Sequence, residues 1–312
     1  MLSLSITTWC VTSLIITIPL GLYAYFRHLM RGILRHKTIE GATDYERDLV
    51  YLHQFPRCIA KQVPNMSPFA LKLETWLRLR KIKYKVVPTL KWSNKGQSPF
   101  IYFNGQQIAD SNMIMKYLCQ YFGLDPRDGL SDKEWGASRA LRHMVESSLV
   151  WTFFYFRYTD HYSLFAKVHN IPLPKPLANF IRTRMAKGVK KRCYHIGIGR
   201  LTTEEMYEVG LEDIRALSCY LGDNDFMCGT KPSAIDCCVF GHLAQVAYVH
   251  SLPYPHRELL ETECPNLLRY LDRIKALQWP DWDEVVDPWG VQKLGVVNSV
   301  FSFLFMKDKR HI

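Results

Sequence analysis

The chain has 312 residues, of which 48% are hydrophobic and 22% are charged, a composition that excludes an intrinsically disordered protein. Its 40 Lys and Arg outnumber its 29 Asp and Glu, and the net charge of +11 predicts partners with negative surfaces without choosing among lipid, nucleic acid and acidic protein. The nine cysteines are odd in number and lack C-x-x-C spacing, which argues against a disulfide framework and against a structural zinc site. The cysteine pattern therefore favours a reducing compartment, and the sequence predicts no metal site.

Residues 1–29 have the properties of a transmembrane anchor. No charged side chain precedes Arg27, and the apolar run from Leu2 to Phe26 is long enough to cross a bilayer at about 1.5 Å per residue. A cleaved secretory signal is the alternative, but it lacks a basic start, and the basic residues instead follow the apolar run. Because basic residues mark the cytoplasmic flank, the pattern predicts a single-pass membrane protein with its folded domains in the cytoplasm, the organelle being unspecified. A polar linker follows over residues 30–47.

Residues 48–124 are predicted to fold in the order strand, helix, strand, hairpin, helix, which is the order of a thioredoxin-like domain. Ser67 and Pro68 suit the N-cap and first position of the first helix. The Asn104-Gly105 pair between two short apolar runs is a strong hairpin signal. Ser111 then stands where the N-cap of the next helix is expected.

Residues 135–282 carry long helical patterns and form the predicted all-α domain, joined to the first domain by a linker over 125–134. The fold class is therefore α+β. Within the helical part, Ser233 and Asp236 have the Ser-x-x-Asp spacing of a capping box, a structural feature. The tail over 283–312 includes an apolar segment, Leu294 to Met306, that is too short to span and suits either an interfacial or a packed terminal helix.

A basic run extends from Arg182 to Arg200. Its first interpretation is a solvated helix face, and its second is a patch facing anionic lipid. Nucleic acid is the least favoured partner, because no nucleic-acid-binding motif accompanies the charge.

The sequence around the hairpin resembles the glutathione-binding half of the glutathione transferases. In that family a cis-proline, matched here by Pro99, leaves the backbone of the preceding residue, Ser98, free to pair with the tripeptide. An acidic-Ser pair, matched by Asp110 and Ser111, receives the γ-glutamyl group. The resemblance implies glutathione as a ligand at these four residues. The alternative is that Pro99 starts an ordinary strand and Ser111 only caps a helix. The Ser233–Asp236 box resembles one inside the helical domain of the same family.

A closer resemblance, over Asp48 to Trp282, is to the failed axon connections family, which includes nematode cadmium-responsive proteins and is related to the metaxins. The matching segments are His53 to Arg57, Val63-Pro64, Met66 to Phe69, Leu71 to Thr75, His195 to Arg200 and Val239 to Gln245. The resemblance implies a metaxin-like glutathione transferase fold, membrane association and a role in axon development or cadmium response, but no demonstrated reaction.

Ser67 resembles the catalytic Ser or Cys position of the transferases. A helix N-terminus lowers the pKa of a cysteine thiol enough to activate it, but a serine hydroxyl starts far above neutral pH and is activated much less. In addition, the segment from Phe55 to Met66 forms a long loop before Ser67. The leading hypothesis is therefore binding, of glutathione or a protein partner, with weak or no catalysis. One alternative is a glutathione-dependent transferase acting on electrophiles or heavy-metal conjugates, with Ser67 polarising the thiol. Another is a metaxin-like assembly subunit at an organelle surface.

Overall fold

The structure, a computed structural model, describes residues 45–57, 62–89, 91–162, 164 and 175–286. The predicted anchor over 1–29, most of the linker over 30–47 and the apolar segment over 294–306 lie outside these residues. None of the helices within the described ranges has the length and hydrophobicity needed to cross a bilayer.

A four-stranded sheet forms the base of the first domain. Its strands are β1 (Val50–Gln54), β2 (Tyr84–Pro88), β3 (Phe100–Phe103) and β4 (Gln106–Ala109), in the spatial order β2-β1-β3-β4. β1 runs parallel to β2, and β3 runs antiparallel to both β1 and β4. The predicted hairpin is confirmed, with positive φ at both Asn104 and Gly105, the conformation that a two-residue Asn-Gly turn favours.

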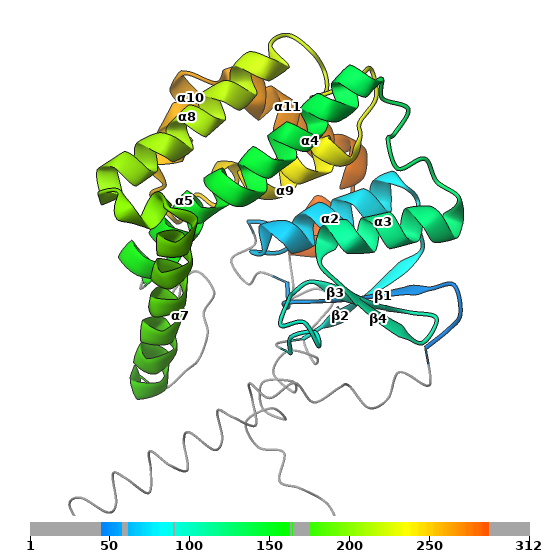
Figure 1. The fold of residues 1–312 in the computed structure, drawn as a ribbon, viewed down its shortest axis with the longest axis horizontal. Coiled ribbons are helices and arrows are strands. Elements are labelled where there is room, and N and C mark those ends of the chain that lie inside the picture. Colours follow the sequence, from blue (N-terminus) through cyan, green and yellow to red (C-terminus); the bar gives the residue numbers. More distant parts are fainter. Residues whose placement is uncertain (1–44, 58–61, 90, 163, 165–174, 287–312) are drawn as a thin grey trace, which may run out of the picture.

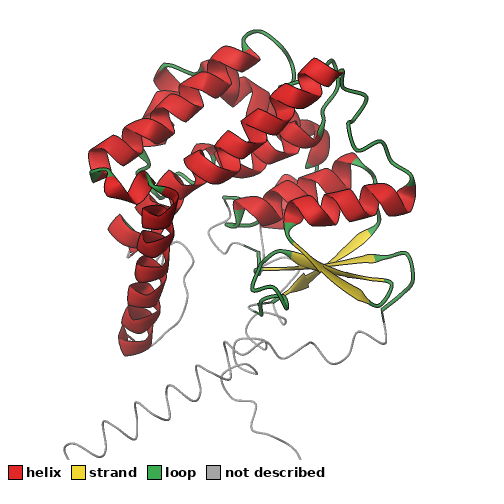
Figure 2. Ribbon diagram, in the orientation of Figure 1, coloured by secondary structure: helices red, strands yellow, loops and turns green. Residues whose placement is uncertain are grey.

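Two helices, α2 (Pro68–Leu79) and α3 (Ser111–Phe122), cover one face of the sheet (Figures 1 and 2). Because side chains alternate along a strand, one set points into the core beneath these helices and the other points to the opposite face. The buried core residues include Leu52 and Ile101 of the sheet, Trp76 of α2 and Leu118 of α3. The predicted thioredoxin-like arrangement is thus confirmed.

The helical domain lies on the other side of α2 and α3 (Figure 1). Its elements are α4 (Asp132–Met144), the π-helix η2 (Val145–Leu149), α5 (Val150–Tyr155), the π-helix η3 (Phe156–Asp160), α7 (Lys175–Ile196), the 3₁₀ turn η4 (Ile198–Arg200), α8 (Thr203–Leu221), α9 (Ala234–Ala247), α10 (Pro255–Thr262), α11 (Pro265–Gln278) and α12 (Trp282–Val286). α4 begins inside the segment predicted as a linker, and α12 extends beyond the predicted end of the domain at residue 282.

The two domains meet where α2 packs on α9. Every residue of α9 from Ile235 to Ala247 is buried, so this helix is the centre of the helical domain. A Cβ placed on Gly241 would lie 2.6 Å from the backbone nitrogen of Lys72 and 2.7 Å from the carbonyl oxygen of Pro68. Glycine at this position lets the backbones of the two helices touch, and the contact holds the domains together.

Candidate functional site

The Ser98–Pro99 peptide bond is cis and lies directly before β3. Pro99 is buried and Ser98 is half-buried. The buried Oγ of Ser98 has no hydrogen-bond partner among the described residues. An unpaired buried hydroxyl is unfavourable, so this atom is one that a ligand could satisfy.

Asp110, and not Ser111, is the N-cap of α3. The Oδ1 atom of Asp110 accepts hydrogen bonds from the backbone N–H groups of Asn112 at 2.9 Å and Met113 at 3.2 Å. The prediction that Ser111 caps the helix is therefore wrong. A carboxylate suits the positive end of a helix, and Asp110 reaches these groups from a backbone with φ of 75° and ψ of 120°. Gln97 donates to the other carboxylate oxygen of Asp110 at 3.4 Å.

Ser111 is instead the first residue of α3, and it is buried. Its Oγ accepts a hydrogen bond from the Nζ atom of Lys72, which comes from α2, at 3.3 Å. Because the hydroxyl oxygen accepts from Lys72, its own proton remains available to donate to another group.

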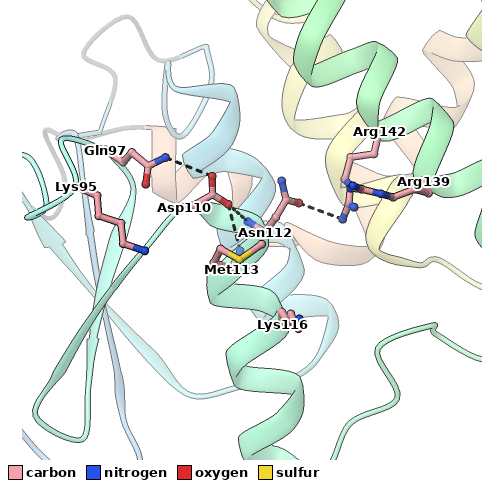
Figure 3. A pocket seen from close by; sticks show the side chains of 8 residues that line it. All are labelled: Lys95, Gln97, Asp110, Asn112, Met113, Lys116, Arg139 and Arg142. Carbon is pink, nitrogen blue, oxygen red and sulfur yellow. Dashed lines mark hydrogen bonds between the residues drawn. The ribbon is translucent and has the colours of Figure 1, made fainter.

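A pocket of about 490 Å³ opens beside the start of α3 (Figure 3). Its walls come from the loop before β3, from the first turns of α3 and from α4. The residues lining it are Lys95, Gln97, Asp110, Asn112, Met113, Lys116, Arg139 and Arg142. Four of these side chains are cationic and one is a carboxylate, so the pocket favours a ligand with more negative than positive charge.

A buried ionic cluster lies next to this pocket and joins three elements. The fully buried Nζ of Lys72 donates to Glu146 Oε1 at 2.5 Å and to Asn112 Oδ1 at 2.6 Å. The Nδ2 of Asn112 donates to Glu146 Oε2 at 2.8 Å. Burial raises the pKa of Glu146. The positive charge of Lys72 and the hydrogen bonds that Lys72 and Asn112 donate to this carboxylate outweigh burial and lower its pKa to about 2. The cluster therefore contains an ionised pair that connects α2, α3 and η2.

Sequence reasoning missed Lys72, although a signal was present. Lys72 lies three residues after Phe69 and four before Trp76, which places a charge on the predicted apolar face of α2. Glu146, Arg139 and Arg142 carried no comparable signal. They belong to the other domain and join the site because α4 and η2 pack on α9, which in turn packs on α2.

Ser67 is the N-cap of α2, as predicted. Its Oγ accepts from the backbone N–H of Ala70 at 3.4 Å, and its own N–H donates to Asn65 Oδ1 at 2.9 Å. Within the described part of the chain, no histidine, carboxylate or amine forms a hydrogen bond with the Ser67 hydroxyl. These contacts position the start of the helix, and none of the described side chains is placed to act as a base for this group.

Asp236 has the contacts of one half of a capping box. Its Oδ2 accepts from the N–H and the hydroxyl of Ser233 at 2.8 and 3.0 Å, and its Oδ1 accepts from Met227 N–H and from Tyr270 Oη. Burial raises the pKa of this carboxyl, and the four donors offset part of that effect. Asp236 thus connects the start of α9 with α11 and with the loop before α9. Across the described ranges, no group of three or more His, Cys, Asp or Glu could hold a metal ion.

Family models match both halves of the chain. The glutathione S-transferase N-terminal domain matches residues 68–163, and the glutathione S-transferase C-terminal domain matches residues 210–274. The chain is also similar in fold to a glutathione S-transferase of Ceriporiopsis subvermispora, solved in complex with glutathione. Its TM-score is 0.51 at 16% identity, over 73% of this chain and 97% of that one. This likeness shows the fold alone.

Three relatives indicate which family within the glutathione transferase fold the chain is similar to. Failed axon connections of Drosophila melanogaster is 36% identical over 78% of this chain, and the alignment spans about three fifths (61%) of that relative's length. Isoprene-epoxide–glutathione S-transferase of Rhodococcus is 27% identical over 68% of this chain and 93% of its own. Metaxin-2 of Mus musculus is 24% identical over 68% of this chain and 82% of its own.

Proposed function

Because the chain belongs to the failed axon connections family, with a metaxin-like glutathione transferase fold, we propose that it binds glutathione beside the start of α3 and acts mainly through binding. The observation that supports this most is the pocket itself. Four cationic side chains and the carboxylate of Asp110 converge where the two domains meet. The family suggests a setting in axon development or stress response, including the response to cadmium.

The charges of glutathione fit this set of residues. The tripeptide carries one ammonium and two carboxylates, and the pocket offers one carboxylate and four cations. We assign the ammonium to Asp110, which lines the pocket, and the γ-glutamyl carboxylate to the hydroxyl of Ser111, which is buried next to Asp110 and does not itself line the pocket. The backbone of Ser98, ahead of Pro99, pairs with the extended peptide.

Weak or absent catalysis follows from the surroundings of Ser67. Its hydroxyl already caps α2 and lacks a base among its described neighbours, and a serine hydroxyl titrates far above neutral pH. The alternative, a glutathione-dependent transferase in heavy-metal or electrophile detoxification, is favoured by the likeness to the Rhodococcus enzyme. In that case Ser67 would polarise the glutathione thiol, and Ser67→Ala would lower the conjugation rate of the folded protein about tenfold or more.

A second candidate is a metaxin-like assembly subunit at an organelle surface. The alignment with Metaxin-2 over 82% of that protein favours it, and a protein partner would then take the place of a small substrate. We also propose that residues 1–29 anchor the chain in a membrane with its folded domains in the cytoplasm. Removing residues 1–31 should release the protein from carbonate-washed membranes, and retention in the pellet would exclude a single anchor.

Calorimetry on the 312-residue chain with glutathione tests the binding proposal. Asp110→Asn is the sharpest variant, because Asn caps helices as well as Asp does but lacks the charge that would hold the ligand ammonium. Losing one charge-assisted hydrogen bond should weaken binding by about 1.5 to 3 kcal/mol, or roughly 10- to 100-fold. Asp223→Asn, at an exposed position, is the matched control. Unchanged affinity in Asp110→Asn would remove Asp110 from the site, and no binding by the unaltered chain would refute the proposal.

A further inference from the structure

α7 is the most one-sidedly charged element of the described structure. The sequence contains no Asp or Glu between Asp160 and Glu204, a stretch that includes the whole 22-residue helix. Within α7, the cations whose side chains are described are Arg182, Arg184, Lys187, Lys190, Lys191 and Arg192, and all are exposed. Among the ion pairs formed between described residues, none includes a basic residue of α7.

One side of α7 is fixed to the body of the helical domain. Cys193 is fully buried, the guanidinium of Arg192 lies 5.4 Å from the ring centre of Trp151, and Lys190 Nζ lies 6.0 Å from that of Tyr155. Both aromatic residues belong to α5. Figure 1 shows α7 running along one side of the molecule, with one end extending past the other helices. The helix is thus held at its inner side, and its outer side keeps a defined orientation.

The outer side carries a single continuous stripe of exposed residues. Phe180, Arg184, Lys187, Lys191 and Tyr194 follow one another at steps of four, three, four and three, which places them in one line along an α-helix. All five are exposed, including Phe180 at 36% and Tyr194 at 55%. Arg200, just beyond the helix, lies over the Tyr194 ring at 5.1 Å and adds a fourth cation at that end. The stripe therefore has three cations in the middle and an aromatic ring at each end.

An aliphatic side chain is exposed next to one end of the stripe. Leu201, 41% exposed, directly follows Arg200, whose guanidinium lies over the Tyr194 ring. Aliphatic side chains gain free energy by entering the boundary of a lipid bilayer, whereas a nucleic-acid backbone offers them no comparable environment. The combination of cations, aromatic rings and aliphatic groups therefore favours a lipid surface over a polynucleotide.

We propose that the stripe formed by Phe180, Arg184, Lys187, Lys191 and Tyr194 docks α7 on an anionic lipid surface. The three cations lie at the level of the head groups, and the ring of Tyr194, 55% exposed, enters the interface, where aromatic residues are favoured. The proposal does not depend on glutathione binding, because no residue of α7 lines the pocket beside α3.

Hydrogen–deuterium exchange on the 312-residue chain tests this docking. The chain is mixed with vesicles of phosphatidylcholine alone or of phosphatidylcholine with phosphatidylserine, so that any apolar anchoring is common to both samples. Amide protection in α7 should rise only with phosphatidylserine and should fall at high salt, because salt screens charges at a surface.

The variant Arg184→Gln, Lys187→Gln, Lys191→Gln removes the three cations and keeps residues that favour a helix. Each basic side chain near an anionic leaflet strengthens binding about fivefold, so the docking equilibrium should weaken on the order of 100-fold. The control Lys81→Gln, Lys83→Gln, Lys85→Gln makes the same change of charge at exposed positions around β2 and should leave docking unchanged.

Three results would overturn the proposal. These are equal α7 protection on both vesicle types, equal loss of docking in the two triple variants, and protection by a single-stranded RNA oligonucleotide without protection by phosphatidylserine. Exchange measured without lipid verifies that α7 remains folded in each variant.

Discussion

The ion pair between Lys72 and Glu146 should be a major contributor to stability, and Glu146→Gln tests it. The substitution keeps the shape of the side chain but leaves one acceptor oxygen for two donors, Lys72 Nζ and Asn112 Nδ2, and removes the charge opposite a fully buried ammonium. The pKa of Glu146 is about 2 in the folded protein against an ordinary 4.5. At about 1.4 kcal/mol per pKa unit, the ionised carboxylate contributes about 3 kcal/mol to folding at neutral pH. Removing one partner of a buried pair commonly costs 3 to 5 kcal/mol, which agrees.

Equilibrium urea unfolding of the purified protein at pH 7 measures this effect. Glu146→Gln and Lys72→Met should each lower the free energy of unfolding by about 3 kcal/mol. The double variant Lys72→Met, Glu146→Leu should lose much less than the sum, because a packed apolar pair leaves no buried charge without a partner. Arg127→Gln, in the exposed pair with Asp132, is the control and should have little effect.

The stabilisation by Glu146 depends on pH in a defined direction. Because folding lowers the pKa of Glu146, its stabilising contribution is complete above pH 4.5 and is lost as the pH falls towards 2. Losses below about 1 kcal/mol in both single variants, or strictly additive losses in the double variant, would refute the role assigned to the pair.

Three further predictions concern other parts of the fold. Gly241→Ala should destabilise the protein by about 1 to 3 kcal/mol in urea unfolding, because its Cβ would overlap the backbone of α2. Ser67→Ala should cost about 1 kcal/mol as a lost N-cap and leave glutathione affinity, measured by calorimetry, unchanged. Burial lowers the pKa of His242 to about 4 and of His256 to about 3, so each contributes stability that is complete above pH 6.5 and is lost as the pH falls. Stability at pH 5 should therefore be about 2 kcal/mol lower per histidine than at pH 7, and His256→Gln should reduce that difference.

Local signals in the sequence were sufficient for the sheet and its helices. The Asn104-Gly105 turn, the Ser67-Pro68 helix start and the short apolar run of β3 each depend on a few neighbouring residues, and all appear in the structure as predicted. The N-cap of α3 was misplaced by one residue, because Asp110 and Ser111 both suit that position by type. In the structure the Asp110 side chain accepts from the first N–H groups of α3, whereas the Ser111 hydroxyl accepts from Lys72 inside the protein.

The cation-rich pocket could not be predicted in the same way, because its walls come from both domains. Lys95 and Lys116 lie in the thioredoxin-like domain, whereas Arg139 and Arg142 lie on α4 of the helical domain. Sequence patterns identify each segment as a helix or a loop, but they do not give the angle at which α4 crosses α3. The convergence of these side chains follows from the contact of α2 with α9, in which Gly241 permits close approach.

Lys72 shows how part of such a site can still be inferred. Its place between Phe69 and Trp76 on the core face of α2 predicts burial, and a buried ammonium is strongly unfavourable without a hydrogen-bonded anion. The position of Lys72 therefore implies an acidic partner from another element, although local pattern does not identify it. Glu146 is that partner, 74 residues away in the other domain. A charge on a predicted apolar face is thus evidence for a contact between domains, and it marks the place where their interface carries polar chemistry.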